Sequence, residues 1–325
     1  MTWRKRLRRL ATALCVALAG SAGGDPVRLI FVGDIMLDDE PGRVVRRGGD
    51  PLAAFAAVLN DADYRIGNLE CPIATAGKPL DNKLFSFRAD PRVLRVLEGR
   101  FDALGVANNH SGDHGQAAFL ETLSHLAGHG IAVFGGGRTL AEAHRPLWIE
   151  IRGLRIAVLG YNEFKPRSFE AGAEWPGIAW SEDAQVVADI RAARAAGADL
   201  VIPFMHWGWE RERQPSERQR QLARTMIDAG ADLVVGGHPH VTQGTEYYQG
   251  KLIVYSLGNF VFDGFDYPAA KNGWLLRLTV DKNGLVDWDT LAAEIDDDGS
   301  PHPKPGSATP CGRADDPLIG DCRNF

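Results

Sequence analysis

The segment VRLIFVGD, residues 27–34, is a run of apolar residues that ends in a glycine and an aspartate. Five later segments share this design, each an apolar run followed by polar residues: YRIGNLE (64–70), FDALGVANNH (101–110), DLVIPFMHWGWE (199–210), ADLVVGGHPH (231–240) and KLIVYSLGNF (251–260). Buried parallel strands are rich in Val, Ile and Leu, and ligands bind outside the carboxyl ends of such strands. The six segments therefore predict an α/β protein with one shared site.

The polar residues at these strand ends have the chemistry of metal ligands. Neutral imidazoles mixed with carboxylates and an amide oxygen suit one or two divalent first-row ions such as Mn, Zn or Fe. The candidate ligands are Asp34, Glu70, Asn109, His206, His238 and His240. An aspartate after a strand is often only a helix cap, and a histidine such as His206 is often only a core residue, but the shared position at strand ends favours ligands. His238 and His240 alternate, so in an extended segment both would face one side.

Two residues are candidates for proton transfer. Histidine is the side chain with an ordinary pKa closest to neutrality, so His110 is the expected general acid. Glu210 is expected to orient a histidine or to accept a proton from an attacking water. Asp113 is a further candidate for fixing the tautomer of an imidazole.

Other residues near the motifs are candidates for binding substrate. Arg88 is the preferred one, ahead of Lys83, because guanidinium groups bind carboxylates and phosphates in a bidentate manner. Asn68 and Asn259 are expected to contact substrate or to fix loops around the site. Four aromatic residues close to the motifs pack in the core or form an apolar wall for the substrate: Trp207, Trp209, Phe260 and Phe262.

The composition of the chain indicates where the protein works and which classes of partner are excluded. Residues 1–24 have a basic head, an apolar run and small residues, which is the pattern of a signal peptide. Without these residues the chain has 31 Lys and Arg against 42 Asp and Glu, a formal net charge of −11. Such an acidic chain is a poor binder of nucleic acid or anionic lipid. We expect an exported protein that is periplasmic or associated with the cell envelope.

The periodicity of the chain predicts one domain over residues 25–295. Strand and helix signals continue up to about Glu294 without a linker-like gap, with helices expected over Pro51–Leu59, Pro91–Leu97, Gly115–Leu126, Ala184–Ala196 and Ser216–Ala229. Residues 146–161 predict a hairpin that turns at Arg152 and Gly153, and mainly strands follow Thr245. The acidic and Pro/Ser-rich tail, residues 296–325, is expected to be irregular. Within it, Cys311 and Cys322 are expected to form a disulfide, which leaves Cys71 as a buried free thiol.

Six motifs in order, FVGDIML, GNLECPI, ANNH, HWGWE, GGHPHVTQG and SLGNFVF, resemble the CapA family of poly-γ-glutamate capsule synthesis proteins, which is related to the calcineurin-like metallophosphoesterases. The resemblance spans about residues 27–291 and implies a four-layer α/β/β/α sandwich of the metallo-dependent phosphatase type. It implies that Asp34 binds a first metal, Glu70 bridges two metals, Asn109 binds the second, and His110 protonates the leaving group. The three histidines His206, His238 and His240 complete the ligand set.

One position departs from the phosphoesterase pattern. Met36 stands where those enzymes have a histidine ligand, and a thioether binds borderline divalent ions poorly. Two functions therefore remain open. The first is a metal-dependent hydrolase that cleaves phosphoesters or γ-glutamyl amides in the synthesis, transport or release of poly-γ-glutamate. The second is a non-catalytic subunit that binds the polymer within a membrane-associated synthesis or export complex; an epimerase on the same site is a third possibility.

Overall fold

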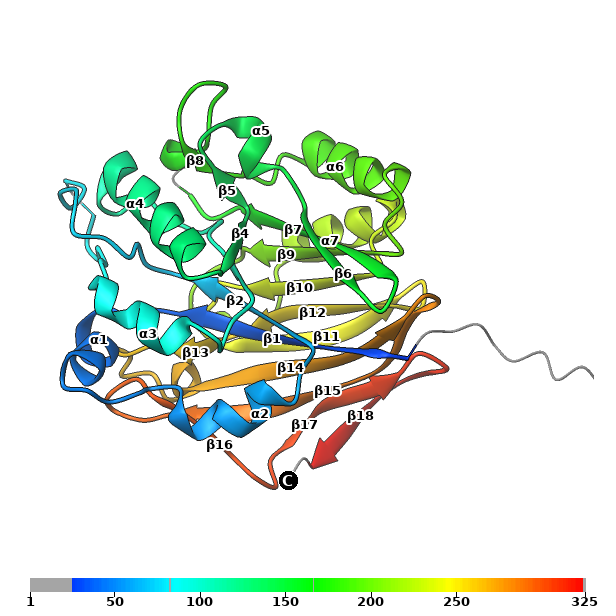
Figure 1. The fold of residues 1–325 in the computed structure, drawn as a ribbon. Coiled ribbons are helices and arrows are strands. Elements are labelled where there is room, and N and C mark those ends of the chain that lie inside the picture. The colour runs from blue at the N-terminus through cyan, green and yellow to red at the C-terminus, as the bar shows by residue number, and fades with distance from the viewer. Residues whose placement is uncertain (1–24, 82, 166, 324–325) are drawn as a thin grey trace, which may run out of the picture.

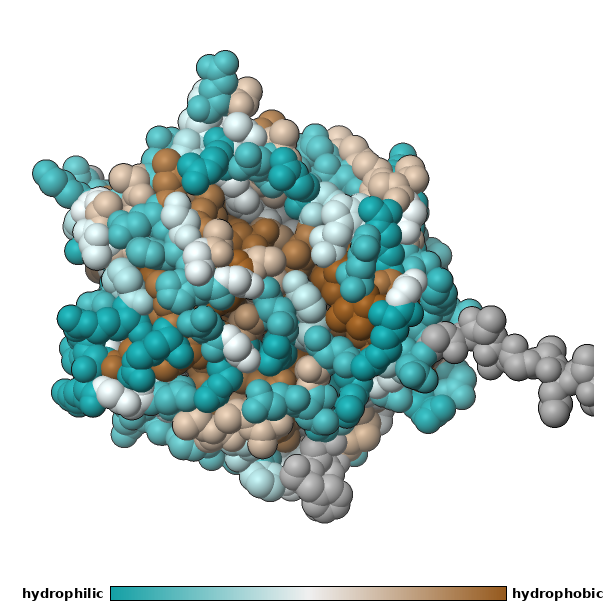
Figure 2. Space-filling view, in the orientation of Figure 1, coloured by the Kyte–Doolittle hydropathy of each residue, from teal (hydrophilic) through white to brown (hydrophobic). Residues whose placement is uncertain are grey.

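The computed structural model describes residues 25–323 except 82 and 166, so the expected signal peptide at residues 1–24 lies outside the described residues. Two β-sheets stack against each other, and helices cover both outer faces (Figure 1). This is the four-layer α/β/β/α arrangement that the family resemblance implies. On the face seen in Figure 2, hydrophilic residues predominate and hydrophobic residues form separate patches. No helix in the described part of the chain is long and apolar enough to cross a membrane.

The first sheet has ten strands in the order β18-β17-β15-β14-β1-β2-β3-β4, with β13 beside β1 and β16 beside β15. Strands β1 to β4 are parallel, so their carboxyl ends share one edge, whereas β14 is antiparallel to β1. The strands are β1 (Val27–Ile35), β2 (Tyr64–Leu69), β3 (Ala103–Gly105), β4 (Ala132–Phe134), β13 (Asn259–Val261), β14 (Asn272–Asp281), β15 (Gly284–Ile295), β16 (Pro301–Pro303), β17 (Ala308–Arg313) and β18 (Asp316–Arg323).

The second sheet has six strands in the order β11-β12-β10-β9-β7-β6. Its central strands β7, β9, β10 and β12 are parallel. The hairpin β6-β7 turns at Arg152 and Gly153, whose φ angles of 50° and 75° suit a tight hairpin turn, as the sequence predicts. The strands are β6 (Leu147–Ile151), β7 (Leu154–Asn162), β9 (Leu200–His206), β10 (Leu233–Gly237), β11 (Thr242–Tyr248) and β12 (Lys251–Leu257), and a separate pair consists of β5 (Gly136–Gly137) and β8 (Gly177–Ile178).

Three apolar cores hold the layers together. The core between the sheets includes Phe31 of β1 and Phe204 of β9, whose ring centroids lie 5.7 Å apart. One outer core packs the first sheet against α1 (Asp39–Arg46), α2 (Ala56–Asn60), α3 (Leu94–Leu97) and α4 (Gly115–Gly128). The other packs the second sheet against α5 (Leu140–Ala143), α6 (Asp183–Ala195) and α7 (Glu217–Ala229). Four short 3₁₀ turns complete the fold: η1 (Ala53–Phe55), η2 (Pro91–Val93), η3 (Arg167–Phe169) and η4 (Pro268–Lys271).

Two expected helices are shorter than their patterns indicate. Residues 51–59 form η1 and the short α2, because the side chain of Asp50 accepts a hydrogen bond from the amide of Leu52 and makes a turn where the helix was expected to begin. Residues 91–97 likewise divide into η2 and α3, with Asp90 capping the first turn through the amide of Arg92. Neither change moves a strand that leads to the site.

The expectation of an irregular C-terminal tail is wrong. Residues 301–323 form β16, β17 and β18, which extend the first sheet beyond β15. Proline lacks an amide donor but is tolerated in edge strands, so a Pro-rich composition did not exclude strands here. Thr309 Oγ1 donates a hydrogen bond to the carbonyl of Thr290, and Thr290 Oγ1 donates one to the carbonyl of Pro310.

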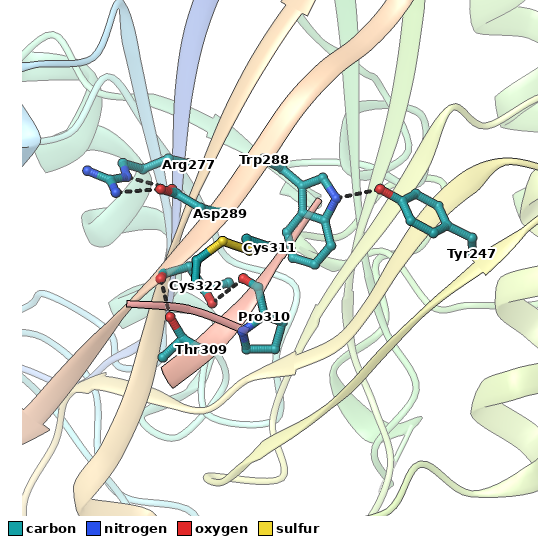
Figure 3. The surroundings of a disulfide bond; sticks show 9 residues. Tyr247, Arg277, Trp288, Asp289, Thr309, Pro310, Cys311 and Cys322 are labelled. Atoms are coloured by element: carbon teal, nitrogen blue, oxygen red, sulfur yellow. Dashed lines mark hydrogen bonds and ion pairs between the residues drawn. A yellow bond between two sulfur atoms is a disulfide. The ribbon is translucent and has the colours of Figure 1, made fainter. Parts of the chain in front are cut away.

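A disulfide bond joins Cys311 and Cys322, the pairing expected from the sequence (Figure 3). Close to it, the indole of Trp288 on β15 donates a 2.7 Å hydrogen bond to the hydroxyl of Tyr247 on β11. The two residues belong to different sheets, so this bond ties the sheets together near the tail. Cys71 is free and buried, and burial raises the pKa of its thiol, so it is unreactive at neutral pH.

Candidate metal centre

The strand ends of both sheets meet at one edge of the sandwich. Asp34 lies in β1, Glu70 directly follows β2, and the loop after β3 carries Asn109. His206 is the last residue of β9, and His238 follows β10. The first sheet therefore supplies oxygen donors and the second supplies imidazoles.

The carboxylate of Glu70 lies at the centre of this cluster. Its Oε1 atom is 3.4 Å from Nε2 of His206 and 3.8 Å from Nε2 of His240. Asp34 Oδ2 is 3.4 Å from Nδ1 of His240. The donor atoms of Glu70, His238 and His240 lie within 4.8 Å of one another, and so do those of Asp34, Glu70 and His206. Two overlapping groups of donors share Glu70, as expected for a bridging carboxylate.

Three further donors converge on one side of Glu70. His206 Nε2 is 2.7 Å from Oδ1 of Asn109 and 3.0 Å from Nδ1 of His238. Together with Glu70, these residues place two imidazoles and a carboxylate around Asn109, the residue that the resemblance assigns to a second metal.

The unpaired polar atoms of the cluster fit a bound cation. Among the described residues, both carboxylate oxygens of Glu70 and Nε2 of His238 are buried without a hydrogen-bond partner. Leaving such groups unpaired costs free energy, and buried polar groups in proteins nearly always have a partner. Nitrogen and oxygen donors of this kind suit Mn, Zn or Fe. A divalent ion would satisfy these atoms, so the residues present fit the expected cofactor.

Burial sets the charge states of the cluster. It lowers the pKa of His206 to about 3 and that of His238 well below its ordinary value, so both imidazoles are neutral at pH 7. Neutral imidazole is the form that binds a metal. Burial, followed by the negative charge of Asp34, raises the pKa of Glu70 well above its ordinary value. A bound cation would stabilise the ionised form of Glu70.

Asn68 and Asn259 orient the ligands, and their expected contact with substrate stays a prediction. Asn259 Oδ1 lies 2.8 Å from Nδ1 of His240. Asn68 Nδ2 donates a 2.8 Å hydrogen bond to Asp34 and lies 3.2 Å from Nδ1 of His206. Both amides are buried and hydrogen-bonded to protein groups around the site.

The loop that carries His238 and His240 has an unusual backbone. Their φ angles are 93° and 57°, so neither residue is extended, and the alternation argument from the sequence is wrong. Non-glycine residues in this region are uncommon and concentrate at functional sites. A Cβ atom on the preceding Gly237 would lie 2.9 Å from Oδ1 of Asp34, so only glycine lets this loop approach the carboxylate.

Met36 contributes no donor to the cluster. Its side chain is fully buried, and its sulfur accepts a hydrogen bond of 3.2 Å from the amide of Asp38. The side of the cluster where Oδ2 of Asp34 lies 3.4 Å from Nδ1 of His240 therefore gains no donor from residue 36.

His110 belongs to a network beside the metal ligands. Its Nδ1 atom donates to Oδ2 of Asp113 at 2.7 Å, which leaves Nε2 free to exchange a proton. Lys83 contacts the other oxygen of Asp113 and donates a 2.7 Å hydrogen bond to the carbonyl of Asn109. Burial lowers the pKa of His110, and the hydrogen bond and charge of Asp113 oppose this effect only in part.

Two predicted roles have no direct contact with the site behind them among the described residues. Glu210 is exposed and makes no hydrogen bond or ion pair with a site histidine, while its negative charge is one of those that raise the pKa of Glu70. Arg88 donates hydrogen bonds to the carbonyls of Ala76 and Gly77, so its guanidinium fixes a loop, and its role in binding substrate stays a prediction. Lys83, ranked behind Arg88 from the sequence, is the cation that reaches the site.

Phenylalanine rings contact the histidines of the site. Phe87 lies 4.6 Å from His110 between ring centroids, and Phe164 lies 3.9 Å from His238. Phe262 and Phe265 lie 4.9 and 5.0 Å from His240. Phe164 was missed from the sequence because it follows β7, a strand whose end carries none of the six motifs. These rings exclude water from the ligands and narrow the approach to them.

The comparison with known families agrees with this geometry. Residues 28–264 match the family model described as bacterial capsule synthesis protein PGA_cap. The chain belongs to this family. PGA_cap relatives include the PGA biosynthesis protein CapA of Bacillus subtilis (strain 168), which is 32% identical over 83% of this chain and 72% of its own length. The capsule biosynthesis protein CapA of Bacillus anthracis is 32% identical over 86% of this chain and 70% of its own.

Two further matches are more distant. A probable polyglutamine synthesis accessory protein of Mycobacterium tuberculosis (strain H37Rv) is 32% identical over 65% of this chain and 58% of its own. Among solved structures, a putative 5'-nucleotidase from Staphylococcus aureus has a TM-score of 0.49 at 12% identity, covering 86% of this chain and 53% of that one. A likeness at this level does not bear on activity. The CapA family predicted from the six motifs is confirmed by the family model and the two Bacillus relatives.

Proposed function

We propose that this PGA_cap protein is a metal-dependent hydrolase that acts on poly-γ-glutamate, or on a related anionic capsule polymer or precursor, during its synthesis, transport or release. The observation that supports hydrolysis is the buried, unpaired donor set of Glu70 and His238 between two groups of ligands. The names of the Bacillus relatives support the polymer. Phosphoester and γ-glutamyl amide bonds are the two candidate targets.

The residues of the site have separate proposed roles in metal binding, proton transfer and orientation. Asp34, Glu70, Asn109, His206, His238 and His240 would hold the ion or ions. A bound divalent ion supplies a Lewis acid and makes water available as a nucleophile near pH 7. His110 accepts a proton at Nε2 from water and passes it to the leaving group, while Asp113 holds the Nδ1 proton and fixes the ring. Lys83 neutralises Asp113 and keeps its carboxylate in place.

A second candidate is a non-catalytic accessory subunit that binds the polymer within a membrane-associated synthesis or export complex. Met36 favours it, because a buried thioether with its sulfur engaged leaves one metal position short of a donor. The complete network around His110 favours the enzyme, because a binding site has no evident need for a proton carrier with its own carboxylate.

Metal analysis and kinetics separate the two candidates. The wild-type protein, purified without chelator, is expected to contain one or two equivalents of a first-row metal by elemental mass spectrometry, and His238→Ala is expected to lose it. His125→Ala, on the distant helix α4, is the matched control. His110→Ala is expected to keep the metal and lose on the order of 10²- to 10⁴-fold in hydrolysis rate. Absence of metal after reconstitution with Mn, Zn and Fe would overturn the hydrolase.

We further propose that the protein works outside the cytoplasm. The signal-peptide pattern of residues 1–24 supports export, and so does the disulfide between Cys311 and Cys322, since structural disulfides persist in oxidising compartments. Fractionation of cells that express the full chain, with detection by antibody, tests this. Recovery in the cytoplasmic fraction alone would contradict it.

A further inference from the structure

A pocket with a volume of about 330 Å³ lies beside the metal centre, and its walls include the aromatic side chains of Phe164, Trp180 and Trp209. The ring of Phe164 is shared between the two places, because its centroid lies 3.9 Å from that of His238 and 6.0 Å from that of Trp209. The pocket and the metal ligand His238 therefore share one aromatic wall, the ring of Phe164.

Hydrogen bonds fix the position of Phe164, the residue shared by the pocket and the metal centre. Asn162 Oδ1 accepts a hydrogen bond of 3.2 Å from the amide of Phe164, and Asn162 Nδ2 donates one of 3.0 Å to its carbonyl. The amide of Glu163 donates a 2.8 Å bond to the carbonyl of His206. Phe164 is thus fixed to the same strand end that carries a metal ligand, so a group in the pocket is held at a defined distance from the metal centre.

The charged residues of the pocket are mostly paired with one another. Arg218 donates to Glu163 at 2.6 Å and to Asp183 at 2.5 Å. Glu182 accepts a 2.9 Å bond from Arg167. Lys165 also lines the pocket, but it is exposed and can keep its ammonium group in water. The walls therefore offer aromatic surface, and little unpaired charge, to an incoming group.

Trp209 shows that this surface is open. Its side chain is 65% exposed, whereas Trp207, two residues earlier, is fully buried in the core and donates to the carbonyl of Tyr255. A large exposed aromatic beside a polar site is typical of a ligand-binding surface. The sequence left open whether these tryptophans pack in the core or contact substrate, and the structure gives the two residues different environments.

We propose that this pocket is a subsite of the metal centre and binds an uncharged, flat or methylene-rich part of the substrate next to the bond that is cleaved. The subsite rests on the proposed function, because it needs an anionic reacting group held at the metal. The aromatic walls bury the apolar part of the substrate and so hold the reacting group next to His238, the ligand that Phe164 contacts.

Two phosphonates that differ in a single group test the subsite. Methylphosphonate and phenylphosphonate carry the same anionic head, and only the second has a ring for the pocket. With Mn²⁺-loaded protein in isothermal titration calorimetry, phenylphosphonate is expected to bind roughly tenfold more tightly, as burial of one aromatic ring allows. It is also expected to change tryptophan fluorescence, which methylphosphonate leaves unaltered.

Variants then test whether Trp209 causes the preference for phenylphosphonate. Trp209→Ala is expected to reduce the preference for phenylphosphonate to less than about twofold without changing the affinity for methylphosphonate, and Trp209→Phe is expected to restore most of it. Trp175→Ala is the matched control, because Trp175 is 55% exposed and does not line the pocket. Metal content and circular dichroism confirm that each variant is folded and loaded.

The outcomes separate the subsite from the proposed function. Equal affinity of wild type for both phosphonates, or a preference that survives Trp209→Ala, would overturn the subsite and leave the metal-dependent function standing. Failure of both phosphonates to bind a fully metal-loaded protein would overturn the anion-binding role of the metal centre, and the subsite would fall with it.

Discussion

Asp113 binds His110 and the loop of residues 80–87 at the same time. Its Oδ2 atom accepts hydrogen bonds from Nδ1 of His110 at 2.7 Å and from the amide of Phe87 at 2.8 Å. Lys83 contacts its other oxygen, and the amide of Leu80 donates to its carbonyl at 2.8 Å. The orientation of the proposed proton carrier therefore depends on the position of this loop.

Replacement of Asp113 by Asn is expected to lower the hydrolysis rate on the order of 10²- to 10⁴-fold, because the amide no longer stabilises the required tautomer and charge of His110. Metal content is expected to stay at the wild-type value, since Asp113 is outside the two donor groups. Steady-state kinetics and elemental mass spectrometry measure the two quantities. Asp81→Asn, at an exposed position of the same loop, is the control, and loss of metal in Asp113→Asn would contradict the assignment.

Replacement of Met36 by His is expected to strengthen metal binding on the side of the cluster that includes Asp34. An imidazole there adds a donor that the thioether does not supply, and a gain in affinity of about tenfold or more is expected from the effects of ligand-shell changes. Metal content measured across a series of buffered free Mn²⁺ concentrations reports it. Met36→Leu is the matched control and should leave metal binding unchanged; a loss of metal in that variant would identify the sulfur as a ligand.

Glu121 is expected to make stability depend on pH in the acid range. Partial burial raises its pKa, but hydrogen bonds from the amides of Ala76 and Thr75 and from the hydroxyl of Thr75 outweigh this and lower the pKa to about 2. Because the folded pKa lies below the unfolded value of about 4.5, the stabilisation is complete above pH 5 and is lost as the pH falls toward 2.

Urea denaturation of wild type and Glu121→Gln measures this dependence. The free energy of unfolding is expected to be lower for the variant at pH 7, and the difference is expected to shrink between pH 5 and pH 2.5. Glu174→Gln, at an exposed position without a described partner, should match wild type throughout. A difference that stays constant with pH would show that the carboxylate charge of Glu121 does not contribute.

Loss of the disulfide is expected to destabilise the protein by about 2–3 kcal/mol, the range for a bridge that closes a short loop. Cys311 and Cys322 are separated by 11 positions. The double variant Cys311→Ser/Cys322→Ser should have a lower free energy of unfolding than wild type in urea. Reductant should lower the stability of wild type and leave the double variant unchanged, since among the described residues only the buried free thiol of Cys71 remains. Equal stability in all four conditions would contradict the prediction.

The sequence predicted the parts of the fold that depend on periodicity and the parts of the site that lie at strand ends. Apolar runs located β1, β2, β9 and β10, and parallel strands bring their carboxyl ends together, so Asp34 and His206 meet as expected. The β6-β7 hairpin followed from turn chemistry at Arg152 and Gly153.

The roles for which the structure shows no matching contact depend on side-chain direction, which a linear pattern does not contain. Arg88 and Lys83 are five residues apart in one irregular segment, and only the folded loop decides which of them turns toward Asn109. Asn259 follows a strand like the ligands do, yet its amide points beneath His240. The strands of the tail were missed because pairing with β15 overrides a composition that is typical of disorder.

Because the donors come from both sheets, the metal site is complete only after the two sheets have packed together. The oxygen ligands come from residues 34–109 and the imidazoles from residues 206–240, so neither stretch alone can bind the ion well. Only a chain in which both sheets have docked presents the complete set. Tight metal binding would then be limited to fully folded chains, and a chain with one sheet still unformed would stay without metal.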